Sequence, residues 1–386
     1  MKKTYKYRLY PAKAHQTLLA KQLEECRWLY NHMLEHRKHA WEWYGVSLSC
    51  YDQINTLPEL KKSRPSLCLV QSQVLQNVVK RVDLAFKAFF RRLKEGAVDP
   101  GYPRFRGKDR YDSMTFPQGN VGFALVGNTL RLFGVGKVSV LVHRELEGKI
   151  KTCTIRRTKT GKWYACFSCD NVEPKRLLKN PMAVGIDMGI KEFLTTSEAE
   201  DEIVQNPKYL KQSAKRLAQK QRKAELEKTN PILRDKNKKI VAKIHEKVCN
   251  QRNDFHHKTA KRLVGQYGIV IVEDLRPSEM TSEWSAINHA QYDTAWTGFF
   301  SILSNKAAEA GREFLKVDPA YTSQDCSTPG CGHRQKMPLH IRTYDCPKCG
   351  VKQDRNRNAA RNLKRLGLES LALRGWEAPT ITVVQA

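Results

Sequence analysis

Two acidic residues that follow apolar runs are the side chains best placed to do chemistry in this sequence. Asp187 follows the run at residues 182–186, and Glu273 and Asp274 follow the run at residues 269–272. Adjacent residues on a strand point to opposite sides, so only one of Glu273 and Asp274 can face Asp187. Neither run has a helical period, so each is predicted to be a buried strand. A carboxylate at a buried position is costly unless a cation or a hydrogen bond compensates it. The pair therefore predicts a metal site, and the alternative for each residue is an acid that caps a turn or helix.

The segment QDRNRNAARNL at residues 353–363 offers a third contribution. Its apolar positions predict a helix whose first turn presents Asp354 and Asn356. Such residues could complete a metal site at the rim of a sheet, or they could serve as ordinary helix caps. Two residues along a regular helix are separated by about 200° of rotation, so Asp354 and Asn356 cannot occupy the same place.

Four cysteines near the C-terminus predict one zinc ion. Cys326 and Cys331 form one close pair, Cys346 and Cys349 form a second, and a glycine follows each pair. Four thiolates on two such turns are typical of a zinc ribbon, with four unrelated thiols as the alternative. A site closed by four thiolates has no open position for water, so this Zn²⁺ is predicted to be structural. The seven other cysteines are scattered, as reduced thiols inside a cell would be.

The elements that must position these residues follow from the apolar pattern. Helices are predicted over residues 14–33, 74–89, 209–228 and about 238–263. Further strands are predicted over residues 2–10, 129–133, 137–142, 149–157, 162–168 and 192–196. Residues 51–65 are predicted to be a loop and a short helix, and the early strands a small β-barrel interrupted by helices. His256 and His257 are interpreted as packing residues.

Composition identifies the class of partner. The 386 residues include 68 Lys and Arg against 39 Asp and Glu, a formal net charge of +29. This excess destabilises a compact state unless a polyanion neutralises it, so nucleic acid is the leading partner and a membrane surface the weaker alternative. There is no apolar run of about 18 residues and no signal-peptide core, so a cytoplasmic, nucleoid-associated protein without membrane contact is predicted.

The order of these motifs resembles the TnpB family, the transposon-encoded RNA-guided nucleases related to the type V CRISPR effectors. The resemblance covers nearly the whole length of the chain. Its markers are KYRLYP, QNVVKRVDLAFKAFFRR, GIDMGIKEF, NQRNDFHHK, VEDL, DPAYTSQDC, the four-cysteine ribbon and DRNRNAARNL.

The resemblance implies an α/β multi-domain protein with an RNase H-like (RuvC) nuclease domain. The implied divisions are a wedge β-barrel at 1–10 and 98–179, a helical recognition domain at 11–97, the RuvC domain at 180–321 and 353–386, and a zinc ribbon at 322–352. The family binds a transposon-derived guide RNA and cuts double-stranded DNA beside a short motif. We expect a monomer on one RNA.

The resemblance also assigns the catalytic residues and shows one position at which this sequence differs from the family. Asp187 and Glu273 match the first two catalytic acids of the family, whereas Asn356 stands where the third aspartate is usual. Hydrolysis of a phosphodiester with two Mg²⁺ ions needs carboxylates to hold the cations. An asparagine keeps an oxygen ligand but removes a negative charge, and Asp354 is the candidate to replace it as the third magnesium ligand.

Two functions therefore stay open. The first is an RNA-guided DNA endonuclease that uses Asp187, Glu273 and either Asp354 or Asn356. The second is a nuclease-inactive RNA-guided DNA-binding protein, either a repressor or an engineered form. Retention of two costly carboxylates favours the first. A cut-and-paste DDE transposase is a third possibility, which the motif order disfavours.

The resemblance further suggests which side chains read the motif beside the target. Tyr51, Ser72, Gln76 and Thr115 fall in the corresponding segments, and glutamine can bond adenine through two hydrogen bonds. The alternative for each of the four is an ordinary surface or packing residue.

Overall fold

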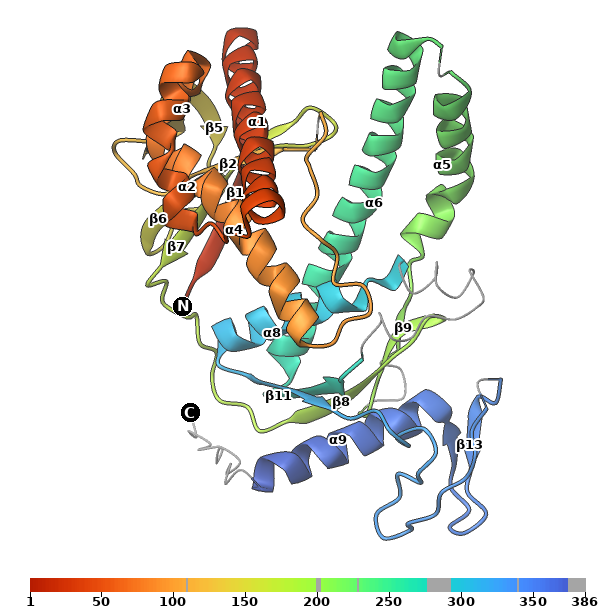
Figure 1. Ribbon diagram of the computed structural model, residues 1–386. Helices are drawn as coiled ribbons and strands as arrows, with labels where there is room; N and C mark the ends of the chain where they lie inside the picture. The colour runs from red at the N-terminus through yellow and green to blue at the C-terminus, as the bar shows by residue number, and fades with distance from the viewer. Residues whose placement is uncertain (109, 199–202, 228, 276–292, 339, 374–386) are drawn as a thin grey trace. The chain divides into compact units, whose positions relative to one another are not determined.

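A computed structural model of the chain describes residues 1–386 except 109, 199–202, 228, 276–292, 339 and 374–386 (Figure 1). The chain divides into an N-terminal unit, residues 1–173, and a C-terminal unit, residues 174–386. Both units combine helices with sheets, so the predicted mixed α/β class is confirmed. No helix among the described residues is long and apolar enough to cross a membrane.

The described part of the N-terminal unit contains a seven-stranded sheet in the order β2-β6-β7-β1-β5-β4-β3. The strand β1 is central and antiparallel to both β5 and β7, with its alternate residues Tyr5, Tyr7 and Leu9 buried. This period of two explains why the N-terminal strand could be predicted. The strands are β1 (Lys3–Tyr10), β2 (Ser113–Phe116), β3 (Phe123–Val126), β4 (Thr129–Leu132), β5 (Gly136–Leu141), β6 (Lys149–Arg157) and β7 (Trp163–Asp170).

Helices fill the chain between β1 and β2. The long helices α1 (Lys13–Tyr44) and α4 (Ser72–Lys94) pack together, and α4 buries Val74, Val78, Val82 and Phe86 at intervals of four residues. Such spacing places all four side chains on one helical face, as predicted.

The prediction of one loop and one short helix over residues 51–65 is wrong. The structure has α2 (Cys50–Asn55), α3 (Leu57–Ser63) and the 3₁₀ helix η1 (Pro65–Leu69). The side chain of Ser49 accepts the backbone N–H of Asp52 and so caps α2. Each proline lies in the first turn of a helix, where its missing N–H costs nothing, so the prolines begin helices here.

The described part of the C-terminal unit contains a five-stranded sheet in the order β10-β9-β8-β11-β12. The strands β8, β11 and β12 are parallel, whereas β9 and β10 are antiparallel to their neighbours. The strand β11, between β8 and β12, is buried along its whole length, which is typical of a sheet covered on both faces. The strands are β8 (Ala183–Met188), β9 (Glu192–Thr196), β10 (Ile203–Gln205), β11 (Ile269–Glu273) and β12 (Glu313–Val317).

Helices cover both faces of this sheet. The helix α9 (Arg355–Leu373) lies along one face, where Leu363 packs on Ile271 (Figure 1). The helices α6 (Pro231–Gln266) and α8 (Trp296–Ala310) share a core with the opposite face of β8 and β11. Gly185 permits the close approach of α9, because a Cβ at this position would collide with the backbone oxygen of Ala360.

Two helices project from the sheet as an antiparallel pair. The helix α5 (Tyr209–Leu226) matches its prediction, but α6 begins at Pro231 instead of about residue 238. The side chain of Asn230 accepts the backbone N–H of Leu233, and Pro231 occupies the first helical position. Asn230-Pro231 is therefore the start signal of α6, and not only the end of α5.

Candidate metal centre

Asp187 and Glu273 lie side by side at the carboxyl edge of the C-terminal sheet. The parallel strands β8 and β11 pair Ile186 with Val272, so the next residue on each strand is one of the two acids. Their carboxyl groups are close enough for each to shift the pKa of the other. Glu273 is buried and Asp187 is partly buried. Residues far apart in the sequence thus form one acidic pair because the strand register aligns them.

The electrostatics of the acidic pair favour a bound cation. Burial raises the pKa of Asp187 well above its usual range, and the adjacent charge and hydrogen bond of Glu273 raise it further. Burial also raises the pKa of Glu273. Two buried carboxyls in contact cannot both carry a charge cheaply, so in the absence of a cation they share a proton. A divalent cation would displace this proton and compensate both charges.

A cavity of about 880 Å³ opens over the pair. Its lining includes Asp187, Glu273 and Asn356, so three of the four predicted catalytic residues surround one space. Asp354 is not among the lining residues. Three further lining residues that the sequence did not suggest are Glu192, Trp296 and Asp318.

Asp354 acts as the N-cap of α9. Its Oδ1 accepts the backbone N–H groups of Asn356, at 2.8 Å, and of Arg357, at 3.1 Å. The residue is exposed, which fits the capping alternative. Asn356, in the first turn of α9, instead donates from Nδ2 to Oε2 of Glu192 at 3.5 Å. The two residues thus have separate surroundings, because Asp354 precedes the helix and Asn356 lies in its first turn.

The residues around the cavity fit magnesium. Carboxylate and amide oxygens are the ligand atoms that Mg²⁺ prefers, and Asp187, Glu273 and Asn356 carry such oxygens. Burial raises the pKa of both acids, and the positive charge of Arg355, which also lines the cavity, acts in the opposite direction. An amide in place of a third carboxylate removes one negative charge from this set of ligands.

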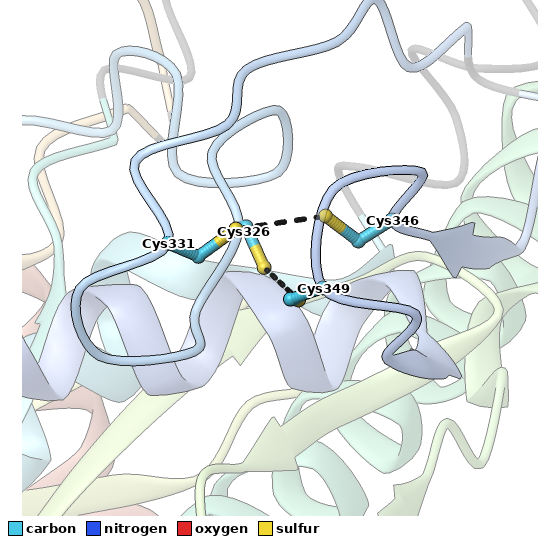
Figure 2. A group of neighbouring side chains, drawn as sticks. All are labelled: Cys326, Cys331, Cys346 and Cys349. Carbon is cyan, nitrogen blue, oxygen red and sulfur yellow. Dashed lines mark hydrogen bonds between the residues drawn. The ribbon is translucent and has the colours of Figure 1, made fainter.

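The four predicted zinc ligands converge. The Sγ atoms of Cys326, Cys331, Cys346 and Cys349 all lie within 4.8 Å of one another (Figure 2). The pairs Cys326–Cys349 and Cys331–Cys346 are 3.6 and 3.7 Å apart. Four sulfurs bound tetrahedrally to one zinc lie about 3.8 Å apart, so the cluster fits this ion. The strands β13 (Thr343–Asp345) and β14 (Lys352–Asp354) form the hairpin beside it.

Two asparagines of α9 that the sequence analysis did not single out fasten the zinc-binding loop to this helix. Asn358 is fully buried, accepts the backbone N–H of Ser327 at 2.9 Å and donates to the backbone oxygen of Asp325 at 2.7 Å. Asn362 donates to the backbone oxygens of Thr322 and Asp325. Amides at this spacing on the inner face of a helix could have suggested such a role, because a buried amide needs partners.

His256 belongs to the core, as predicted. It packs between the rings of Phe193 and Phe299, and one ring nitrogen contacts the backbone oxygen of Thr294 at 3.0 Å. Burial lowers the pKa of His256 to about 4, so the ring is neutral at physiological pH. It does not line the cavity over the acidic pair.

Comparison with known proteins connects this geometry to a family. Three family models match: a helix-turn-helix domain at residues 1–45, "Probable transposase" at 167–283 and "Cas12f1-like, TNB domain" at 296–363. A relative from Streptomyces pristinaespiralis, named "Putative RNA-guided DNA endonuclease", is 31% identical over 96% of this chain and 91% of its own length. A similarly named protein of Escherichia coli is 24% identical over 95% of this chain and 93% of its own length.

The chain belongs to the TnpB family.

The fold of this TnpB-family chain has a solved counterpart. It resembles the protein in the cryo-EM structure of the Cas12f1-sgRNA-target DNA complex, with a TM-score of 0.56, 13% identity, and coverage of 94% of this chain and 98% of that one. At this identity the likeness shows the fold alone. The segment matching the TNB family model contains all four clustered cysteines, so the predicted structural zinc has a place in the family architecture.

The four residues suggested as motif readers in this TnpB-family chain have different surroundings. Tyr51 is exposed on α2, and Gln76 is partly buried on α4. Ser72 accepts a hydrogen bond from Lys61, and Thr115 bonds both Arg81 and Thr154. Thr115 therefore has an internal structural role, whereas Tyr51 and Ser72 are exposed.

Proposed function

We propose that this chain is an RNA-guided DNA endonuclease of the TnpB type. The observation that carries the proposal is the contact between the carboxyls of Asp187 and Glu273 at the edge of the parallel strands, beneath a cavity. Buried acids cluster in this way where a divalent cation is to be bound. The names of two relatives that align over nearly the whole chain support the same activity.

The C-terminal unit is proposed to be the RNase H-like (RuvC) nuclease domain, interrupted by a zinc ribbon at 322–352. Asp187, Glu273 and Asn356 would hold Mg²⁺, which supplies charge stabilisation and an activated water for phosphodiester hydrolysis. A cation held there would favour the ionised form of both carboxyls. In the N-terminal unit, the sheet is proposed to be the wedge domain (1–10 and 98–179) and the helices at 11–97 the recognition domain.

The proposed partners are a guide RNA and double-stranded target DNA. The net charge of +29 needs a polyanion to neutralise it. A cavity of about 750 Å³ in the N-terminal unit is lined by the cations Lys13, Lys21, Arg27, Lys108 and Arg157. Arg27 is paired with Glu24, whereas no salt bridge is found for Lys13, Lys21 or Lys108 among the described residues. Such a surface suits phosphate groups.

A second candidate function is RNA-guided DNA binding without cleavage. The observation that favours it is the neutral Asn356 in the cavity while Asp354 is engaged in capping α9. If the missing charge is not replaced, metal affinity falls and the protein occupies its target without cutting it.

One experiment separates the two functions. The protein is purified with the RNA expressed from its own locus, and matched linear DNA is incubated with it and Mg²⁺. Cleavage that disappears in Asp187→Ala supports the nuclease. Guide-dependent binding without cleavage supports the second function, and cleavage that appears only in Asn356→Asp identifies the asparagine as the block. Absence of any guide-dependent binding would overturn both.

A further inference from the structure

Glu192 is a carboxylate at the candidate metal centre to which no role has been given. It is the first residue of β9, in the hairpin that follows Asp187, and it lines the same cavity as Asp187, Glu273 and Asn356. Only 18% of its side chain is exposed. A carboxylate so far removed from water needs a compensating positive charge or strong hydrogen bonds.

Two other acids in the lining, Asp274 and Asp318, already have protein partners. Asp274 forms a salt bridge with Lys316 at 3.0 Å. Asp318 accepts the backbone N–H of Ala320 at 2.9 Å. Asp274 and Asp318 therefore have protein partners at ordinary hydrogen-bond distances.

Glu192 has only loose partners in the described part of the chain. Its Oε1 lies 4.0 Å from Nζ of Lys191, a side chain that is 71% exposed. Its Oε2 lies 3.5 Å from Nδ2 of Asn356, at the limit of a hydrogen bond. These contacts are too long to offset the loss of hydration, so the carboxylate of Glu192 is available for a cation.

The contact with Asn356 also orients its amide. An amide that donates through Nδ2 to a carboxylate keeps Oδ1 free as an acceptor on its other branch. A ligand held in this way by a charged neighbour is the usual arrangement around bound metals. The carboxylate of Glu192 thus lies beside Asn356, which is neutral where the family usually has an aspartate.

We propose that Glu192 supplies the third carboxylate of the metal centre, in place of the charge that Asn356 lacks. In this proposal Asp187, Glu273 and Glu192 are the carboxylate ligands, and the amide oxygen of Asn356 is a neutral ligand. Among the described residues only the four cysteine sulfurs already lie within 4.8 Å of one another, so a cation would have to draw these carboxylates together. This inference rests on the proposed nuclease function and removes the reason to expect an inactive protein.

The test measures metal binding independently of cleavage. Mn²⁺ is titrated into the full-length protein, and free Mn²⁺ is followed by electron paramagnetic resonance. Glu192→Gln keeps the shape but removes the charge, and we expect it to weaken Mn²⁺ binding about tenfold or more. Asp274→Asn is the matched control, because it removes a charge from the same cavity at a residue already paired with Lys316, and its affinity should equal that of the wild type.

The double variant Glu192→Gln/Asn356→Asp keeps the net charge and moves one carboxylate across the 3.5 Å contact. It should regain most of the lost affinity. A carboxylate at residue 356 adds a ligand whatever Glu192 does, so the double variant is compared with Asn356→Asp alone. If Glu192 is a ligand, Asn356→Asp should bind Mn²⁺ more tightly than the double variant, whereas a structural role of Glu192 predicts equal affinities.

The possible failures are distinguishable. If Glu192→Gln binds Mn²⁺ like the wild type while Asp187→Ala does not, this inference is overturned and the proposed function stands. A double variant that binds as weakly as Glu192→Gln would overturn the inference in the same way. If Asp187→Ala also retains full affinity, the metal centre itself is rejected, and the proposed nuclease function with it.

Discussion

The side chain of Asp354 accepts the backbone N–H of Asn356, so these neighbouring polar residues act on different parts of the molecule. One closes the start of α9, and the other lines the cavity over Asp187 and Glu273. Asp354→Ala should therefore lower the free energy of unfolding by about 1 kcal/mol, the usual value of a lost cap. For a unit of this size the melting temperature should fall by about 2–4 °C.

Asp354→Asn provides the control, because asparagine caps as well as aspartate. Its melting temperature and Mn²⁺ affinity should both stay near those of the wild type. Loss of Mn²⁺ binding in Asp354→Asn would instead make this residue a metal ligand, and the assignment of Asp354 to capping alone would be wrong.

The cysteine cluster should bind one zinc ion per chain. Metal analysis of purified protein should give a stoichiometry near one, and Cys346→Ser should lower it, because a thiolate ligand is lost. Hydrogen bonding to the backbone of Val351 and the side chain of Thr328 lowers the pKa of Cys349 to about 6, which favours the thiolate that zinc needs. Cys68→Ser, at an exposed thiol of the N-terminal unit, should leave the zinc content unchanged.

Stability should fall in acid because of His256. Its pKa in the folded protein is about 4, below the ordinary histidine value of about 6.5, so the unfolded chain takes up a proton first. The stability that this ring contributes is complete above about pH 6.5 and is lost as the pH falls through about 4. The positive charge of Arg252 acts in the same direction as burial.

Melting temperatures measured between pH 7 and pH 4 check this expectation. The slope should be shallower in His256→Gln, whose amide can still donate to the backbone oxygen of Thr294 but does not titrate. His257→Gln, at the exposed neighbour, should keep the wild-type slope. Equal slopes in the wild type and His256→Gln would show that this ring does not govern the acid response.

Gly185 should be intolerant of any side chain. An alanine there would push against the backbone of Ala360 and displace α9, which bears Asn356. Overpacking of this kind costs about 1–3 kcal/mol, and Mn²⁺ affinity should fall along with stability. Gly265→Ala is the control, because no atom lies within 4 Å of its added Cβ and alanine favours the helix by about 1 kcal/mol. A normal Mn²⁺ affinity in Gly185→Ala would show that α9 does not position the centre.

Much of the centre could be predicted because its main parts have local signals. The apolar runs before Asp187 and Glu273 indicate buried strands, and the paired cysteines indicate zinc. Each signal lies within a few neighbouring residues, and the strand register then brings distant segments together.

The parts that could not be predicted depend on contacts between distant segments. Glu192 resembles any polar residue near a hairpin, and it becomes notable only where Asn356, 164 residues later, approaches it. The division between Asp354 and Asn356 likewise needs the exact start of α9. The start of α6 was misplaced because Asn-Pro is a signal both for ending one helix and for beginning the next.

The asparagine bonds between α9 and the cysteine loop connect the two candidate metal sites. Asn358 and Asn362 fasten residues 322–327 to the helix that presents Asn356. If zinc keeps this loop in shape, a chain deprived of zinc would hold its full set of acids and amides but position Asn356 less firmly.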